Sequence, residues 1–266
     1  KDAKIPDSEK CGCMLDLAFV YKNQGRFDEA EDMCRKGLEL QEKINGPNHP
    51  HVAHTLRILS EIYQGQVRYR RAAEALERAI DIMQKVSDDD GVEMAPLQVD
   101  MARLLVTQGH YTRAESLFTE ALAVIESSYG PKHAYTAKVL TSMAKLYVRQ
   151  QRYGRAEELA SRALTVLEKV YGKNHHFLVP VWLVMAKVRI NQDNHSQAQE
   201  LCLDALDILE RVFDEHHPYV PYVLDTLARS YRLSGNESEA GRLEKRAEQI
   251  RGQKRLAYVP KAVTVR

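Results

Sequence analysis

The stretch Leu104–Ala121, LLVTQGHYTRAESLFTEA, contains an apolar run that ends at Gly109, an aromatic residue at Tyr111 and a small residue at Ala114. The same pattern returns 42 residues before and after it. One column of small residues keeps this register through the whole chain: Ala30, Ala72, Ala114, Ala156, Ala198 and Ala240. A second column has the same spacing: Ala18, Ser60, Ala102, Ala144, Ala186 and Ala228. A fixed period of this length is the signature of a repeat protein.

Each repeat is predicted to contain two helices joined by a tight turn. Apolar residues recur at spacings of three, four and seven in the first half of a repeat, as in Leu56, Leu59 and Tyr63, which is one face of an α-helix. Small residues recur where two helices must approach closely. We therefore expect the alanine columns to be buried between the first helix of each repeat (helix A) and the second (helix B).

The order of these residues resembles the tetratricopeptide repeat, whose own period is 34 residues. The stretches GPNHPHVAHTL and YGPKHAYTAKVL, together with the pattern LxxLAxxYxxQGxYxxAExLxxxAL, are similar to the 42-residue repeats of kinesin light chains. The resemblance covers about residues 8–250 and implies an all-α, right-handed superhelical solenoid of six helix–turn–helix repeats. It also implies adaptor behaviour, although such arrays serve many unrelated partners.

The repeats divide the chain into segments. We expect a polar lead-in at residues 1–7 and a basic C-terminal tail at residues 251–266. The six repeats are expected at about residues 8–50, 51–93, 94–134, 135–176, 177–218 and 219–250. The first helix A is expected at about residues 9–24. Three prolines fall in the first turn of a helix A, where a missing N–H costs little: Pro96, Pro180 and Pro221.

Composition excludes several classes of protein. The net charge of +1 lacks the basic excess of a general nucleic-acid-binding protein. No window approaches 18 uncharged apolar residues, so we expect no membrane span. The chain begins at Lys1 and has no signal-peptide pattern, so we treat its N-terminus as truncated or processed. Unpaired cysteines favour a cytoplasmic location: Cys11, Cys13, Cys34 and Cys202.

Histidine is the residue type that could suggest a site of chemistry. One column of the inter-repeat loops carries His49, His133, His175 and His217. These residues would be spread along an array rather than converge on a metal, so we interpret them as residues that close the loops. The sequence has no phosphate-binding glycine loop, HExxH, GxSxG or zinc-type CxxC pair. We therefore expect no catalytic residue, no metal and no cofactor, and we do not expect an enzyme.

Basic residues collect at one position of helix A. The resemblance implies that the A helices line a concave groove, through positions near 2, 5, 9 and 12 of each repeat. The ninth position reads Phe19, Glu61, Arg103, Lys145, Lys187 and Arg229. Nearby groove positions add Lys138, Arg149 and Arg232. We predict that the seven basic residues bind an acidic protein or peptide segment. The alternative is that carboxylates on facing helices neutralise these charges, or that the charges are simply solvated.

The predicted function is a non-catalytic protein–protein interaction scaffold or adaptor that holds a peptide in this groove. One alternative is a regulatory sensor that binds a small ligand or a signalling peptide. Another is the regulatory repeat domain of a larger enzyme. The first helix carries apolar residues on more than one side, among them Leu15, Phe19 and Val20. We expect a second copy of the chain, or chain preceding Lys1, to cover them.

Overall fold

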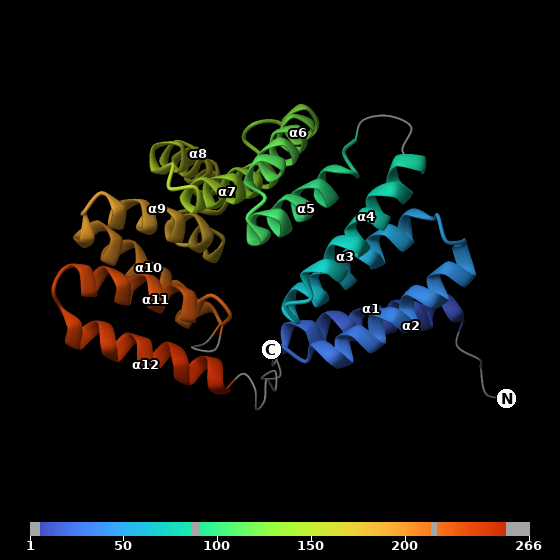
Figure 1. The fold of residues 1–266 in the computed structure, drawn as a ribbon, viewed down its shortest axis with the longest axis horizontal. Coiled ribbons are helices and arrows are strands. Elements are labelled where there is room, and N and C mark those ends of the chain that lie inside the picture. Colours follow the sequence, from blue (N-terminus) through green and yellow to red (C-terminus); the bar gives the residue numbers. More distant parts are fainter. Residues whose placement is uncertain (1–5, 87–90, 214–216, 254–266) are drawn as a thin grey trace. The chain divides into compact units, whose positions relative to one another are not determined.

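The computed structural model describes residues 6–86, 91–213 and 217–253, and all regular structure within them is helical (Figure 1). The first three pairs are α1 (Asp7–Asn23) and α2 (Phe27–Asn45), α3 (Pro50–Gly65) and α4 (Tyr69–Val86), and α5 (Ala95–Gln108) and α6 (Tyr111–Tyr129). The next is α7 (Ala134–Arg149) with α8 (Tyr153–Tyr171). The short 3-10 helix η1 (His176–Leu178) precedes α9 (Val179–Asn191) and α10 (His195–Val212), and α11 (Val220–Leu233) precedes α12 (Glu237–Gln253). The predicted all-α fold of helix–turn–helix repeats is confirmed.

The chain forms two compact units, residues 1–128 and 129–266. In the first unit α1 packs on α2 and α3 on α4, while α2–α3 and α4–α5 contacts join successive repeats. In the second unit α7 packs on α8, α9 on α10 and α11 on α12. There, α9 also contacts both α7 and α11, so the A helices lie side by side. Each repeat therefore presents one A-helix face and one B-helix face.

Both small-residue columns are buried, as predicted. All six alanines of the column that begins at Ala30 are fully inaccessible to solvent, and so are the five alanines of the column that begins at Ala18. Trp182 is also buried, which agrees with its place in a core column. Since a larger side chain at these positions would push two helices apart, the alanines set the distance between helix A and helix B.

The turn between helix A and helix B has the same geometry in every repeat. One residue of the turn, at the same register position in each repeat, adopts a left-handed conformation: Gly25, Val67, Gly109, Gln151, Asp193 and Gly235, with φ between +54° and +88°. The following N–H donates to the carbonyl five residues earlier, as from Arg26 to Tyr21 and from Arg68 to Tyr63, at 2.9 and 2.8 Å. This is the Schellman ending of an α-helix. The turn is thus set by backbone hydrogen bonds, even where glycine is absent.

The loop histidines act as helix caps. The Nδ1 atom of His49 accepts a hydrogen bond from the N–H of His51 at 3.2 Å, and His133 accepts from Tyr135 at the same distance. His175 and His217 repeat the contact with the N–H two residues later, at 3.2 and 3.3 Å. Because the first N–H groups of a helix have no partner inside it, each histidine stabilises the start of a helical segment. The column therefore has a structural role in closing the loops.

Three cysteines lie inside the helix pairs. Cys34 and Cys202 are almost inaccessible, and burial raises the pKa of each thiol to about 12. Cys11 is also buried, and burial raises the pKa of its thiol. Cys13 is exposed on α1. All four thiols are unpaired. Cys34 and Cys202 are therefore core residues of their helix pairs.

Some boundaries differ from those expected. Helix α1 begins at Asp7, inside the predicted lead-in, and α12 runs to Gln253, inside the predicted tail. Residues 87–90, where the sequence SDDD closes the second repeat, lie outside the described residues, and so do residues 254–266. The tail is rich in basic residues, but its structural role stays a prediction.

Val67 is a β-branched residue in a conformation that favours glycine, with φ of +61°. Its side chain is 65% exposed, so little packing would be lost on its removal. We expect Val67→Gly to raise the free energy of unfolding by roughly 0.5–1 kcal/mol, since strain is relieved at some entropic cost. Urea unfolding measures the change. The matched control, Gly109→Val, places valine in the equivalent left-handed turn and should destabilise the chain; a loss of stability in Val67→Gly would contradict this account.

Candidate peptide-binding face

The structure divides the predicted basic column between the two units. Arg103 lies on α5 in the first unit. Lys145, Lys187 and Arg229 lie on α7, α9 and α11 in the second unit. The two parts of the column have different electrostatic surroundings, so each is described by itself.

In the first unit, carboxylates neutralise the basic residues of the A helices. Asp100 lies between two guanidinium groups, 3.3 Å from Arg57 and 3.5 Å from Arg103. Arg57 also lies 3.5 Å from Glu61, which in turn pairs with Lys22 of α1. Burial raises the pKa of the Asp100 carboxyl, and the positive charges of Arg103 and Arg57 oppose that shift. Arg103 is therefore the end of a series of ion pairs in which two carboxylates, Glu61 and Asp100, serve three cations. Its carboxylate partner lies on its own helix rather than on a facing one.

In the second unit, Lys187 has cations rather than carboxylates beside it. Lys187 is exposed as a whole, but partial desolvation by its neighbours lowers the pKa of its ammonium group, and the nearby charges of Arg149 and Arg229 lower it further. Within the described residues, none of these three side chains forms an ion pair with a carboxylate. Asp225 is close enough to oppose the shift, but its carboxylate pairs with Arg251 of α12. We call the surface of Arg149, Lys187 and Arg229 on α7, α9 and α11 the basic face.

Two further candidates lie on α7. Lys138 is exposed, and its Nζ atom lies 5.0 Å from the centre of the Phe177 ring. A cation at this distance is attracted by the aromatic ring. Lys145 is half-buried, and its side chain interacts with other residues of the chain. Both residues belong to the same helix as Arg149, and Lys138 already lies against an aromatic ring.

Arg232 does not belong to the basic face. Its guanidinium donates two hydrogen bonds to the Glu244 carboxylate, at 2.6 and 2.8 Å, and a third to Glu237 at 3.1 Å. These carboxylates raise the pKa of Arg232 and lie on α12, the helix B of the same repeat. A guanidinium held by two carboxylates offers little to an anionic ligand. The prediction that Arg232 binds an acidic partner is therefore not supported by its contacts.

Sequence reasoning missed Asp100 and Asp225, which decide how much of the basic charge is neutralised. Asp100 precedes Arg103 by three residues, a spacing at which side chains meet on one helix face. That spacing was a usable signal. Sequence reasoning also missed the role of Arg189, which stands where other repeats carry Tyr21, Tyr63, Tyr147 or Tyr231. Its guanidinium pairs with Glu157 of α8 at 2.5 Å, which joins two successive repeats of the second unit.

The described residues contain neither a metal-ligand cluster nor a helix that could span a membrane. In residues 6–86, 91–213 and 217–253, histidine, cysteine and acidic side chains form no group of three or more that could hold a metal ion. Over the same ranges, no helix combines the length and the apolar character needed to cross a membrane.

Comparison of the sequence with protein families identifies a repeat built from paired helices, as the structure has. The pattern of the tetratricopeptide repeat matches residues 11–85, 93–169 and 177–253, which together make up most of the chain. The chain belongs to the tetratricopeptide repeat family. The resemblance inferred from the alanine columns is therefore confirmed. A search of curated proteins finds no match to this sequence.

Several solved structures share this fold at low sequence identity. A putative kinesin light chain with TPR-like repeats from Podosopora anserina is 20% identical, with a TM-score of 0.57 over 79% of this chain and 99% of that one. A Rap protein complexed with competence and sporulation factor is 15% identical, with a TM-score of 0.75 over 95% and 66%. Aspartyl phosphate phosphatase F from Bacillus subtilis is 14% identical, with a TM-score of 0.73 over 98% and 65%. At these identities the likeness concerns the fold alone.

The surroundings of Lys187 predict an unusual response to mutation. Because partial desolvation and two arginines disfavour its ammonium, we expect Lys187→Gln to raise the free energy of unfolding at neutral pH. The gain should stay well below about 1 kcal/mol, since solvent screens charges at an exposed side chain. Salt screens the repulsion, so the gain should shrink as ionic strength rises. The folded pKa lies below the unfolded value, so wild-type stability should rise with pH just below the ordinary lysine pKa of about 10.4, and the variant should lose this rise.

Thermal unfolding in low and high salt measures the effect. The control is Lys85→Gln on α4, which removes an ammonium that lies 2.6 Å from Asp81 and should give no gain. If Lys187→Gln lowered the thermal midpoint, the ammonium would have a favourable partner and the basic face would lose its electrostatic basis.

Proposed function

We propose that this tetratricopeptide repeat chain is a protein–protein interaction scaffold that binds an acidic peptide segment on the basic face of its second unit. The observation that carries the proposal is Lys187 of α9, whose ammonium group feels the charges of Arg149 on α7 and Arg229 on α11 and has no carboxylate in ion-pair contact among the described residues. A ligand carboxylate would supply the negative charge that this surface lacks. Tetratricopeptide repeat proteins are generally non-catalytic scaffolds, which supports an interaction role.

A peptide fits the basic face better than a single small anion. The three cations are carried by three different helices, so one carboxylate could contact one or two of them, whereas an extended acidic segment could contact all three. Each exposed ion pair contributes about 0.2–1 kcal/mol, so affinity depends on several contacts together. The Rap protein of the same fold is complexed with competence and sporulation factor, which supports the use of this fold for capturing a partner molecule.

Charge reversal on the basic face tests the proposal. We expect a fluorescein-labelled peptide with glutamate at alternate positions to bind the wild-type chain, and Lys187→Glu with Arg229→Glu to weaken binding at least about tenfold. Binding to the wild type should also weaken as salt rises from about 50 to 500 mM, since the screening length shortens. Fluorescence anisotropy measures both effects.

The control variant, Lys169→Glu with Lys173→Glu, changes the net charge by the same amount on α8 and in the loop after it. Both lysines are exposed. Equal loss of binding in the two variants would mean that only net charge matters, and unchanged binding in Lys187→Glu with Arg229→Glu would place the ligand elsewhere. Either result contradicts the proposed face.

We also propose that the chain self-associates through α1 and that it works in the cytoplasm. The cytoplasmic proposal rests on the four unpaired thiols. The proposal for α1 rests on its exposed apolar residues, Leu17, Phe19 and Val20, which are 43%, 53% and 42% exposed. Contiguous apolar residues on an end helix favour contact with another apolar surface.

Self-association should depend on Val20 and not on a similar valine elsewhere. We expect the sedimentation coefficient of the wild type to rise with protein concentration and that of Val20→Glu to stay constant, because the carboxylate would have to be desolvated at the contact. Val170→Glu on α8 is the matched control, since Val170 is 48% exposed. A wild-type chain that stays monomeric at high concentration would contradict the proposal.

A further inference from the structure

A carboxylate of the chain itself, that of Asp225 on α11, lies beside the basic face. Asp225 precedes Arg229 by four residues, so the two side chains share one face of the helix. Its charge also raises the pKa of Lys187, against the lowering that desolvation and the two arginines cause. Asp225 is therefore placed to neutralise part of the basic face. Its ion pair, however, is with Arg251 of α12, and among the described residues it forms none with Lys187 or Arg229.

Arg251 binds this carboxylate from the last helix. Its guanidinium donates a hydrogen bond to the Oδ2 atom of Asp225, and the two side chains are 47% and 45% exposed. Helix α12 packs on α11, so the pair joins the two helices of one repeat. Because an exposed ion pair contributes little free energy, its partners can exchange. The pairing of Asp225 is therefore open to change.

Both partners are unusual in the repeat register. At the position of Asp225 the other repeats carry no acid: Leu15, Arg57, Val99, Thr141 and Leu183. At the position of Arg251 they carry no charge: Gln41, Met83, Ile125, Leu167 and Leu209. The two charges therefore occur together in the last repeat, and the other repeats pair their helices without them.

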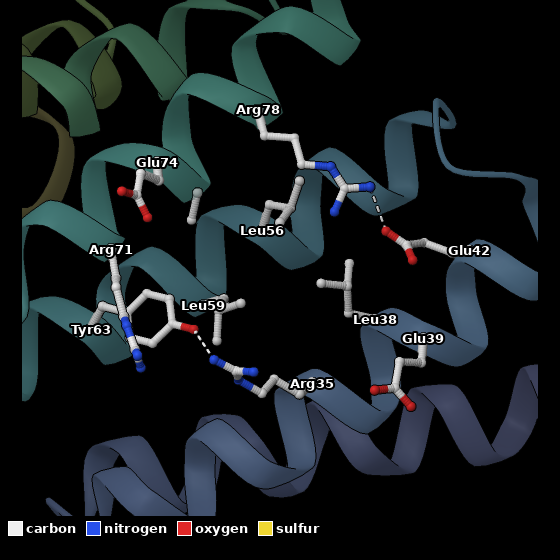
Figure 2. A pocket seen from close by; sticks show the side chains of 11 residues that line it. Arg35, Leu38, Glu39, Glu42, Leu56, Leu59, Tyr63, Arg71, Glu74 and Arg78 are labelled. Atoms are coloured by element: carbon white, nitrogen blue, oxygen red, sulfur yellow. Dashed lines mark hydrogen bonds and ion pairs between the residues drawn. The ribbon is translucent and has the colours of Figure 1, made fainter.

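Ion pairs that serve the packing of the array recur along it. Arg78 of α4 pairs with Glu42 of α2 at 2.5 Å, and both residues line the pocket drawn in Figure 2. Four repeats later, at the same register positions, Arg246 of α12 pairs with Glu210 of α10 at 2.6 Å. These two pairs join the B helices of successive repeats. The pair between α11 and α12 lies within one repeat and has no counterpart at its register positions, so packing of the array does not account for it.

The charge available to a ligand depends on this pair. With Arg251 and Asp225 included, four cations and one carboxylate leave the surface of the basic face with a net charge of +3. Without Arg251, the cations within reach of Asp225 would be Arg229, one helical turn away, and Lys187, whose ammonium already feels its charge. An acidic ligand would then compete with an internal carboxylate for the same two cations.

We propose that Asp225 is an internal competitor of the acidic ligand and that Arg251 is the positioning residue that keeps it away from the basic face. This inference rests on the proposed function of that face. While Asp225 stays with Arg251, Lys187 and Arg229 remain available to a carboxylate of the partner. When Arg251 releases Asp225, this carboxylate pairs with Arg229 or Lys187, and the affinity for the partner falls.

The pKa of Lys187 reports on Asp225 without any ligand, and NMR titration of selectively labelled lysine side chains measures it. Asp225→Asn should lower this pKa further, because a favourable charge is lost. Arg251→Gln should raise it in the wild type, and by clearly less in the Asp225→Asn background, because the effect passes through the carboxylate. An equal rise in both backgrounds would overturn the positioning role, since Arg251 would then act only by its own charge.

Binding of the labelled glutamate peptide tests the competition. In fluorescence anisotropy, Arg251→Gln should weaken binding about threefold, the effect of one exposed charge pair, and Asp225→Asn should tighten it by a similar factor. Arg251→Lys keeps a cation for Asp225 and should bind as the wild type does. The matched control, Arg242→Gln, removes the same charge from α12 at an arginine that lies 2.5 Å from Glu239, and it should leave binding unchanged. Circular dichroism verifies that each variant is folded.

The double variant separates positioning from direct contact. Arg251→Gln should leave the affinity of the Asp225→Asn protein nearly unchanged. Equal weakening in both backgrounds would mean that Arg251 contacts the ligand itself, and unchanged binding in Arg251→Gln alone would mean that Asp225 does not compete. Either result overturns the inference and leaves the basic face intact. A wild-type chain that does not bind the peptide would instead overturn the proposed function, and the competition with it, whatever the NMR comparison shows for Arg251.

Discussion

The close contact of helix A and helix B at the buried alanines is the constraint on which the rest of the structure depends. The alanine of the column that begins at Ala30 is fully buried in every repeat, and the second column carries only alanine or serine. The contact fixes the distance between the two helices of a pair. The left-handed turn residue and its Schellman hydrogen bond then fix where one helix ends and the next begins. Together these features allow the remaining positions of a repeat to vary.

That freedom explains why six similar repeats carry different surfaces. At the ninth position of helix A, Arg103 is balanced by Asp100, whereas Lys187 stands beside two further cations. At one position of helix B, five repeats keep a large apolar side chain and the second repeat has Ala75. Neither change disturbs the alanine contact. The surfaces of the repeats can therefore differ while their helix pairing stays the same.

The fold could be predicted from the sequence because its determinants recur six times. The buried alanines and the turn positions each appear in register, so an exception such as Val67 does not hide the pattern. The basic face was predicted less completely. The sequence shows where a basic residue falls in its repeat, but it does not show which carboxylate side chain pairs with that residue in the fold. Asp100 could have been found from its spacing to Arg103. The bond of Arg232 to Glu244 could not, because it depends on the direction of a side chain toward the following helix. From the sequence, the unusually small residue Ala75 is noticed only when one column of helix B is compared across the repeats.

The burial of three of the four thiols has a practical consequence. A thiol whose pKa is raised to about 12, as in Cys34 and Cys202, is almost entirely protonated at neutral pH and does not react readily with alkylating reagents. Cys11 is likewise shielded, while Cys13 is open to solvent on α1. A maleimide dye should therefore attach at one position of the native chain without any engineered cysteine. The label would lie on the helix whose apolar residues are exposed, where its fluorescence would report directly on whatever comes to cover them.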